Sequence, residues 1–164
     1  MRLQKIMVVE RLKEILYRCW DFSLFITGEG SWRLRPIEVV MLDAVKKNLG
    51  HNISSLLETQ LHQKFFIQRM NNSRVNTVIF YNKNEAYKIK DDQFQDLLLK
   101  VELIINKKKQ HAHVTFFEGY ISTIEFKKPK SFYHGKTIEV GDVKLGKSDM
   151  SHASAIDRTE HGKL

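Results

Sequence analysis

Apolar and polar residues alternate over residues 111–126, and this pattern is the clearest structural signal in the chain. Glu118 and Gly119 are the turn residues between the two arms, so the pattern predicts a β-hairpin. A three-residue loop that ends at Gly119, followed by a bulge, would pair Phe116 with Tyr120 and place the apolar residues of both arms on one face. The other face would then carry a mixed set of side chains: His111, His113, Thr115, Ile121, Thr123 and Glu125.

The N-terminal third of the chain has apolar residues at helical spacing. Residues 5–20 carry an apolar stripe opposite a charged one, which predicts an amphipathic helix whose stripe, with Cys19 on it, packs in the core. Pro36 is well placed to begin a second helix, and Gly50 stands just past its end. Asn52 can cap a third helix. Because the connection between the second and third helices is short, we expect them to form one layer.

After residue 63 the spacing changes from helical to strand-like. Residues 65–70 and 75–81 predict a second hairpin, whereas residues 97–105 fit both a strand and a helix. We favour a strand there, because β-branched residues concentrate at its end and it lies between two hairpins. Shorter strands are expected at residues 24–26, 87–90 and 137–140. The elements predict an α+β fold: two or three N-terminal helices packed on one face of an antiparallel sheet of about five strands.

The composition is that of a basic protein with a substantial core. The chain has 164 residues, of which 42% are hydrophobic, and this fits a single α+β domain over residues 1–147. Residues 148–164 are polar and rich in small side chains, so we expect a flexible C-terminal tail. Lysine and arginine number 27 against 19 acidic residues, and the formal net charge of +8 favours an anionic partner: nucleic acid, anionic lipid or acidic protein.

Cysteine usage and hydropathy bear on where the protein works. The single cysteine, Cys19, excludes an intrachain disulfide and a zinc site built mainly from thiolates. A reducing cytoplasm fits this usage best. The sequence lacks an apolar run of the roughly 18 to 20 residues that span a bilayer, and charges interrupt its apolar N-terminal stretch. We therefore expect a cytoplasmic protein without a membrane span.

Two groupings resemble enzyme or metal chemistry but lack the surroundings that such chemistry needs. Residues 141–148 satisfy the phosphate-loop pattern G-x-x-x-x-G-K-[ST], yet neither a parallel strand before them nor a helix after them is predicted. His111 and His113 share a strand face and His134 could approach them, but no acidic partner accompanies the three. No serine or cysteine nucleophile stands beside a base. We expect no catalysis, no cofactor and no bound metal.

Six lysines flank the central hairpin and give the most specific surface prediction. In the predicted register Gln110 lies near Phe126, so the lysines before the first arm and after the second share one end of the hairpin. Such a cluster is either a solvated edge or a patch for an anionic partner, to which residues 132–134 could add stacking. The six are Lys107, Lys108, Lys109, Lys127, Lys128 and Lys130. A secondary candidate surface is the hairpin face that carries His111, His113 and Thr115.

Three segments resemble parts of small uncharacterised bacterial α+β proteins, some of which are similar to immunity proteins that neutralise toxins of competing cells. The segments are LRPIEVVML at 34–42, LETQL at 57–61 and FFEGYISTIEF at 116–126. The resemblance spans roughly residues 34–129, mostly through apolar spacing, and it implies a non-catalytic binder. Immunity proteins against nucleases usually resemble an acidic decoy, whereas this chain is basic. We therefore expect a protein-binding role with an acidic protein partner; a nucleic-acid-binding module is the alternative.

Overall fold

The computed structural model describes residues 2–146 of the chain, so the tail predicted at residues 148–164 lies outside the described residues. Its helices are α1 (Arg2–Ile26), α2 (Pro36–Asn48), α3 (His51–Leu61) and the short α4 (Lys130–Tyr133). Two 3₁₀ turns, η1 and η2, cover Glu85–Tyr87 and Asp92–Phe94. The strands are β1 (Gly30–Ser31), β2 (Phe65–Met70), β3 (Val75–Phe80), β4 (Asp96–Ile105), β5 (Lys108–Phe117), β6 (Tyr120–Phe126) and β7 (Ile138–Leu145).

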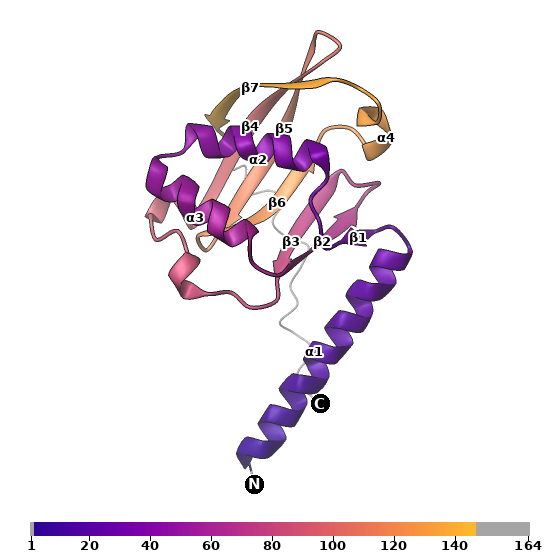
Figure 1. Cartoon of the computed structure of the whole chain (residues 1–164), viewed down its shortest axis with the longest axis vertical. Helices are drawn as coiled ribbons and strands as arrows, with labels where there is room; N and C mark the ends of the chain where they lie inside the picture. Colours follow the sequence, from indigo (N-terminus) through magenta and orange to yellow (C-terminus); the bar gives the residue numbers. More distant parts are fainter. Residues whose placement is uncertain (1, 147–164) are drawn as a thin grey trace.

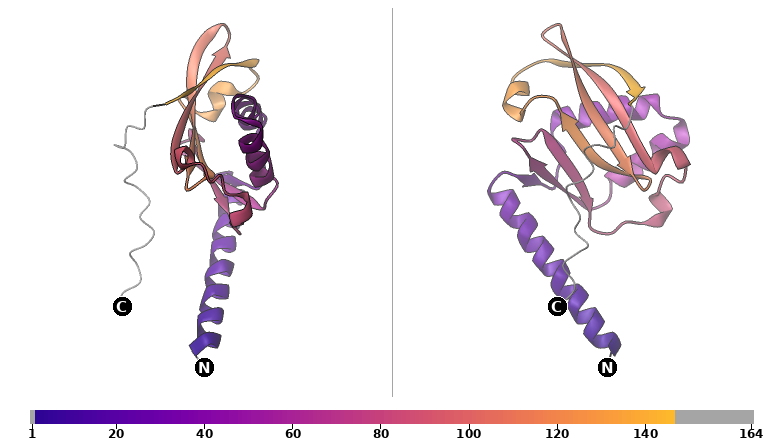
Figure 2. Two further views of the ribbon diagram at one scale, coloured as in Figure 1. Left: turned by 90° about the vertical axis from the view of Figure 1, so that its left-hand side faces the viewer. Right: turned by 180° about the vertical axis from the view of Figure 1, so that it is seen from behind.

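The strands form one antiparallel sheet in the order β1-β2-β3-β6-β5-β4-β7, and α2 and α3 lie across one of its faces (Figure 1; Figure 2, left). The predicted α+β class with an antiparallel sheet is confirmed. The described sheet has seven strands instead of about five. The strands expected at residues 65–70, 75–81, 97–105 and 137–140 are present as β2, β3, β4 and a longer β7.

The core fills the space between the sheet and the two helices that cover it. Met41, Val45 and Leu57 are fully buried beneath α2 and α3. Every second residue of each central strand faces these helices, because successive side chains of a strand point to opposite faces of the sheet. On β4 and β5 the buried residues are Leu99, Val101, Leu103, Ile105, Ala112, Val114 and Phe116. The pattern on the central hairpin therefore predicted its buried face correctly.

The loop of that hairpin differs from the prediction. Phe117 pairs with Tyr120, so the loop is the two residues Glu118 and Gly119, with φ of 51° and 76°. This is the left-handed pair that a tight hairpin turn prefers. The register then shifts by one residue between Thr115 and Phe116, a bulge that turns Ile121 into the core, where it is only 1% exposed.

Gln60 of α3 supplies the physical reason for this register. Its buried side-chain amide donates to the carbonyl of Gly119 at 2.8 Å and accepts from the backbone N–H of Ile121 at 3.1 Å. A buried backbone N–H left without a partner would cost a large desolvation penalty, so this amide stabilises the bulge. The predicted three-residue loop and the placement of Ile121 on the open face were wrong because this contact comes from another layer.

Helix α1 does not pack its apolar stripe in the core, contrary to the prediction. It runs away from the sheet, and only its C-terminal end lies beside β1 and β2 (Figure 1; Figure 2, right). Cys19 is exposed. Among residues 12, 13 and 15–26 of α1, the large apolar side chains that are exposed are Leu12, Ile15, Leu16, Tyr17, Trp20, Phe22, Phe25 and Ile26. The stripe had the spacing of a buried helix, but α2 and α3 already cover one sheet face and α1 enters from the sheet edge.

Polar and aromatic contacts hold the C-terminal end of α1 to the sheet. The Tyr81 hydroxyl donates to the buried Asp21 carboxylate at 2.8 Å and accepts from Nε1 of Trp32 at 3.1 Å. The ring of Trp32 lies 4.9 Å from that of Phe25 and 5.1 Å from that of Phe66. Phe66 points away from the α2–α3 layer by strand alternation, so this cluster covers the opposite face of β2.

Smaller differences concern short elements and caps. Residues 24–26 belong to α1, so no separate strand forms there. Residues 87–90 are the end of a 3₁₀ turn and an irregular segment, because the N–H of Ile89 bonds to the carbonyl of Gly119 and not to a neighbouring strand. Gly50 is the N-cap of α3, where Asn52 was expected.

Candidate functional site

The lysines of the central hairpin lie at one end of the sheet, but they are staggered. Strand β6 ends at Phe126, which pairs with Ala112, whereas β5 continues to Lys108 and pairs with β4. At about 3.3 Å per residue, Lys108 lies roughly 13 Å farther along the strand direction than Ala112. Lys107 sits in the β4–β5 turn, which projects beyond the rest of the sheet (Figure 1). We call Lys107, Lys108, Lys109, Lys127 and Lys128 the lysine end; all five are exposed.

Little acidic charge accompanies the lysine end. Lys109 pairs with Glu102 of β4, with 3.0 Å between Nζ and Oε1. Among the ion pairs within residues 2–146, this is the one that involves a lysine of the cluster. The other four lysines form two sequence-adjacent pairs, Lys107 with Lys108 at the β4–β5 turn and Lys127 with Lys128 after β6. Repulsion acts mainly within each pair, because salt largely screens exposed charges that are more than about 8 to 10 Å apart.

The structure separates Lys130, the sixth predicted lysine, from the lysine end. It begins α4, and its backbone N–H donates to the carbonyl of Asn72 at 3.0 Å. Lys130 lines a cavity at the N-terminal end of α2 together with Arg35 and Arg69. The chain turns at Pro129, the N-cap of α4, and this turn could not be read from the hairpin register.

The aromatic residues predicted to accompany the lysines are largely engaged inside the protein. Tyr133 is buried, and its hydroxyl accepts from the backbone N–H of Lys128 at 3.3 Å. The ring of Phe132 packs against that of Tyr133, and Nζ of Lys136 lies 3.6 Å from the Phe132 ring centroid. His134 is exposed. These contacts leave little free aromatic surface for stacking.

His111, His113 and Thr115 share the sheet face opposite α2 and α3, as predicted from their spacing. His113 lies between Glu125 of β6 and Lys100 of β4, and His111 lies opposite Glu102. Burial lowers the pKa of His111, and the positive charge of Lys100 lowers it further. The imidazole of His111 is therefore neutral at physiological pH. Within residues 2–146 no group of three or more histidine, cysteine or acidic side chains has the geometry to hold a metal ion.

The phosphate-loop pattern falls mostly on a strand. Gly141 through Leu145 belong to β7: Val143, Lys144 and Leu145 pair with β4, and Gly141 and Asp142 lie at an irregularity in the register. Residues that must curl around a phosphate cannot at the same time lie flat in a sheet ladder. Lys147 and Ser148, the last two residues of the pattern, lie outside the described residues.

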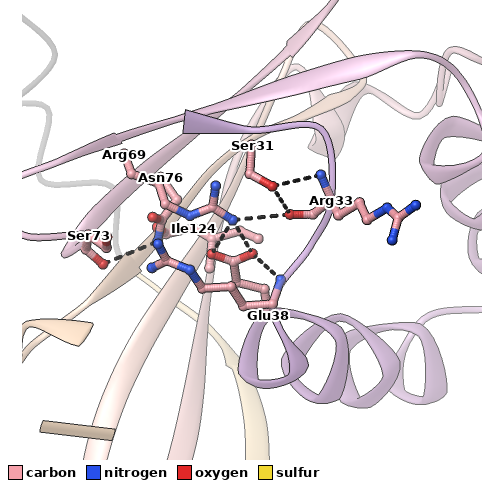
Figure 3. A network of polar contacts seen from close by, with 8 residues as sticks. Ser31, Arg33, Glu38, Arg69, Ser73, Asn76 and Ile124 are labelled. Atoms are coloured by element: carbon pink, nitrogen blue, oxygen red, sulfur yellow. Dashed lines mark hydrogen bonds and ion pairs between the residues drawn. The ribbon is translucent and has the colours of Figure 1, made fainter. Parts of the chain in front are cut away.

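A buried charge network at the N-terminal end of α2 was not found from the sequence. Nη2 of Arg69 donates to Oε2 of Glu38 at 3.1 Å and to the carbonyl of Arg33 at 3.2 Å (Figure 3). The backbone N–H of Arg35 donates to the same Glu38 oxygen at 2.7 Å. Glu38 thus binds the first turn of α2 to strand β2, and both charged side chains are only 1% exposed.

This network forms one wall of an open cavity of about 870 Å³. The cavity lies between the end of α1, the β2–β3 turn and the start of α4, and its charged lining residues are Glu29, Arg35, Arg69 and Lys130. One feature of the sequence could have located this buried charge network. Residues 65, 67 and 69 face the core by alternation, and an arginine at the third of these positions needs a buried partner.

Comparison with family models, curated proteins and solved structures finds no significant match to this chain. Among residues 2–146, no helix is both long enough and apolar enough to cross a membrane. The function must therefore be argued from the surfaces described above.

Proposed function

We propose that this protein is a non-catalytic binding protein that receives an acidic protein partner at the lysine end, in the manner of an immunity-type toxin inhibitor. One observation carries the proposal: five exposed lysines lie toward the same end of the sheet, three at the projecting β4–β5 turn and two just after β6, with the Glu102 carboxylate as the acid paired among them. An acidic surface placed against this end relieves the repulsion between the ammonium groups and steers the encounter of the two proteins.

The exposed apolar residues of α1 favour a protein over a nucleic acid as the partner class. A contiguous apolar patch of this kind on a folded protein marks a surface that contacts proteins or membranes. Leu16, at 67% exposed, and Trp20, at 56%, lie on a helix that stands clear of the sheet (Figure 1). The aliphatic members of this patch, Leu12, Ile15, Leu16 and Ile26, offer nothing to phosphate groups and no ring on which a base can stack.

The lysine end is also consistent with the alternative, a nucleic-acid-binding module, but the aromatic residues at positions 132 and 133 do not support it. Single-stranded nucleic acid is held by cations together with exposed rings on which bases stack. Here the ring of Phe132 is covered by Tyr133 and Lys136, and Tyr133 is buried. Binding through the lysine end to nucleic acid would thus rest on charge alone and would depend steeply on salt.

The experiment is capture of partners from the native cells with immobilised protein, followed by binding measurements on the purified candidates. The test variant is Lys108→Glu/Lys128→Glu. The matched control is Lys64→Glu/Lys90→Glu, because Lys64 and Lys90 are exposed near the opposite end of the sheet. Both variants change the net charge by the same amount.

We expect an acidic protein that binds wild type and the control alike and binds the test variant at least about tenfold more weakly, since several charge-assisted contacts are lost. Mixed oligonucleotides should not compete for the same end. If nuclease treatment removes all captured material and oligonucleotides bind the lysine end instead, the nucleic-acid alternative replaces the proposal. Equal binding of both variants to the purified partner would place the site elsewhere.

A further inference from the structure

Arg69 has more hydrogen-bond donors than the protein uses. Its Nη2 atom is saturated by Glu38 and the carbonyl of Arg33, but Nε and Nη1 have no partner in the structure. A guanidinium carries five N–H groups, so three of them, one on Nε and two on Nη1, are unsatisfied. The residue is 4% exposed and lines the 870 Å³ cavity, so bulk water compensates little of the loss.

A second guanidinium stands beside the first. Burial lowers the pKa of Arg35, and the nearby charge of Arg69 lowers it further. Arg35 lines the same cavity, as does Lys130 from the start of α4. Three cationic residues therefore line one space together with one acid, Glu29, so positive charge is in excess there. Glu38 is already occupied by Arg69 and by the backbone N–H of Arg35. Like charges at one partly buried place are costly unless an anion lies between them.

We propose that this cavity binds the phosphate group of a small phosphorylated molecule. Glu38 holds Arg69 in place through Nη2, so the positive charge of Arg69 is fixed at the cavity wall before the ligand arrives. The unpaired Nε and Nη1 atoms are themselves closed to solvent. Arg35 and Lys130 add charge from two other elements. A phosphate offers three oxygens and up to two negative charges, which matches three cations better than the single charge of a carboxylate does.

The size of the cavity is consistent with an organic group attached to the phosphate. Ligand pockets commonly have volumes of roughly 300 to 1,000 Å³, and this one, at about 870 Å³, is much larger than a phosphate alone requires. The cavity shares no lining residue with the lysine end, so this proposal stands or falls independently of the proposed function.

The test uses the full chain labelled with ¹⁵N and follows the Nε–H resonance of Arg69 while inorganic phosphate or ribose 5-phosphate is added at constant ionic strength. We expect a saturable shift with dissociation constants around the millimolar range or below. Acetate, the carboxylate probe, should bind at least about tenfold more weakly, because it bears one charge and two oxygens.

Arg35→Gln is the main variant, because it leaves the buried pair of Arg69 and Glu38 intact. It should weaken phosphate binding about tenfold or more, since a charge-assisted contact is lost. Without phosphate it should melt at the same temperature as wild type or higher, because it removes a like charge from beside Arg69. Lys64→Gln is the matched control for loss of one positive charge far from the cavity. It should leave the titration unchanged.

Three outcomes would overturn the proposal. One is a resonance of Arg69 that does not saturate at phosphate concentrations up to about 50 mM, well above ordinary affinities for such a site. Another is that Arg35→Gln and Lys64→Gln weaken phosphate binding equally, which would mean that the affinity depends only on the net charge of the protein. The third is acetate binding as tight as phosphate binding. Normal phosphate binding by Lys107→Glu/Lys108→Glu is expected and would show that the cavity works without the projecting part of the lysine end.

Discussion

Nη2 of Arg69 and Oε2 of Glu38 are 3.1 Å apart, and both side chains are withdrawn from solvent. The pair joins the first turn of α2 to strand β2 across a separation of 31 residues in the sequence. Because each charge depends on the other for compensation, removing one leaves the second buried and unpaired.

Glu38→Gln should therefore destabilise the protein by about 3 to 5 kcal/mol, the usual cost of breaking a buried pair by removing one partner. Denaturant unfolding in a buffer without phosphate measures this. Glu139→Gln is the matched control, because Glu139 is exposed on β7 and should change stability by less than about 0.5 kcal/mol. Similar small effects of both substitutions would show that the pair is not buried as described.

The central hairpin offers two adjacent phenylalanines in opposite environments. Phe116 is fully buried and Phe117 is 53% exposed. Phe116→Ala should cost about 3 to 5 kcal/mol of unfolding free energy, whereas Phe117→Ala should cost less than about 1 kcal/mol. Chemical denaturation of both variants gives the comparison. If the order is reversed, the register of β5 and β6 is wrong.

Helix α1 gives a prediction of the opposite kind. Leu16 is 67% exposed, whereas Leu57 in α3 is fully buried. Leu16→Ala should leave the unfolding free energy within about 0.5 kcal/mol of wild type, because alanine keeps the helix propensity and no core contact is lost. Leu57→Ala should cost about 2 to 5 kcal/mol. A comparable loss from Leu16→Ala would mean that the stripe of α1 is covered.

These contrasts show how far the sequence could be interpreted. Alternation on β5 and β6 predicted the buried face, because side-chain direction in a strand is a local property. The bulge at Ile121 was not predictable, since it depends on Gln60, 61 residues earlier in the chain. The stripe on α1 showed that one side of a helix is apolar, but spacing alone cannot tell what covers it.

Of the two candidate sites, one could be predicted in outline from local pairing and the other depends on contacts between distant parts of the chain. The sequence predicted six lysines at one end of the hairpin, and five of them lie toward that end. The pairing behind the prediction was wrong by two residues, because Phe126 lies opposite Ala112 and not near Gln110. The position of Lys130 depends on the turn at Pro129, which brings it to the cavity beside Arg69. Arg69 and Arg35 lie 34 residues apart in number and meet only through the fold, so no local pattern joined them.

The anchor of α1 should make stability depend on alkaline pH. Burial raises the pKa of Tyr81 to about 12, and its hydrogen bond to Asp21 adds to the shift. The folded state thus favours the neutral phenol. The stabilisation that the neutral Tyr81 hydroxyl provides is fully present below the pKa of about 10 that tyrosine has in the unfolded chain. It is lost as the pH rises through the higher pKa of Tyr81 in the folded protein. Tyr81→Phe removes the titrating group, so the stability difference between wild type and this variant should shrink from pH 10 to 12.

Urea unfolding at several pH values measures that difference. A gap between wild type and Tyr81→Phe that stays constant over this range would show that the hydroxyl is not held by Asp21. Lysine residues also titrate there, but they are common to both proteins and cancel in the comparison.

The rate at which the purified acidic partner associates with the protein tests the lysine end most directly. Stopped-flow measurements at low and at physiological salt would compare wild type, Lys108→Glu/Lys128→Glu and the control Lys64→Glu/Lys90→Glu. Charge at the contact acts mainly on encounter, so we predict a rate for the test variant at least about tenfold below that of the control at low salt, and a gap that narrows as salt rises. Equal rates for the two variants at low salt, with both folded as wild type, would contradict binding at the lysine end.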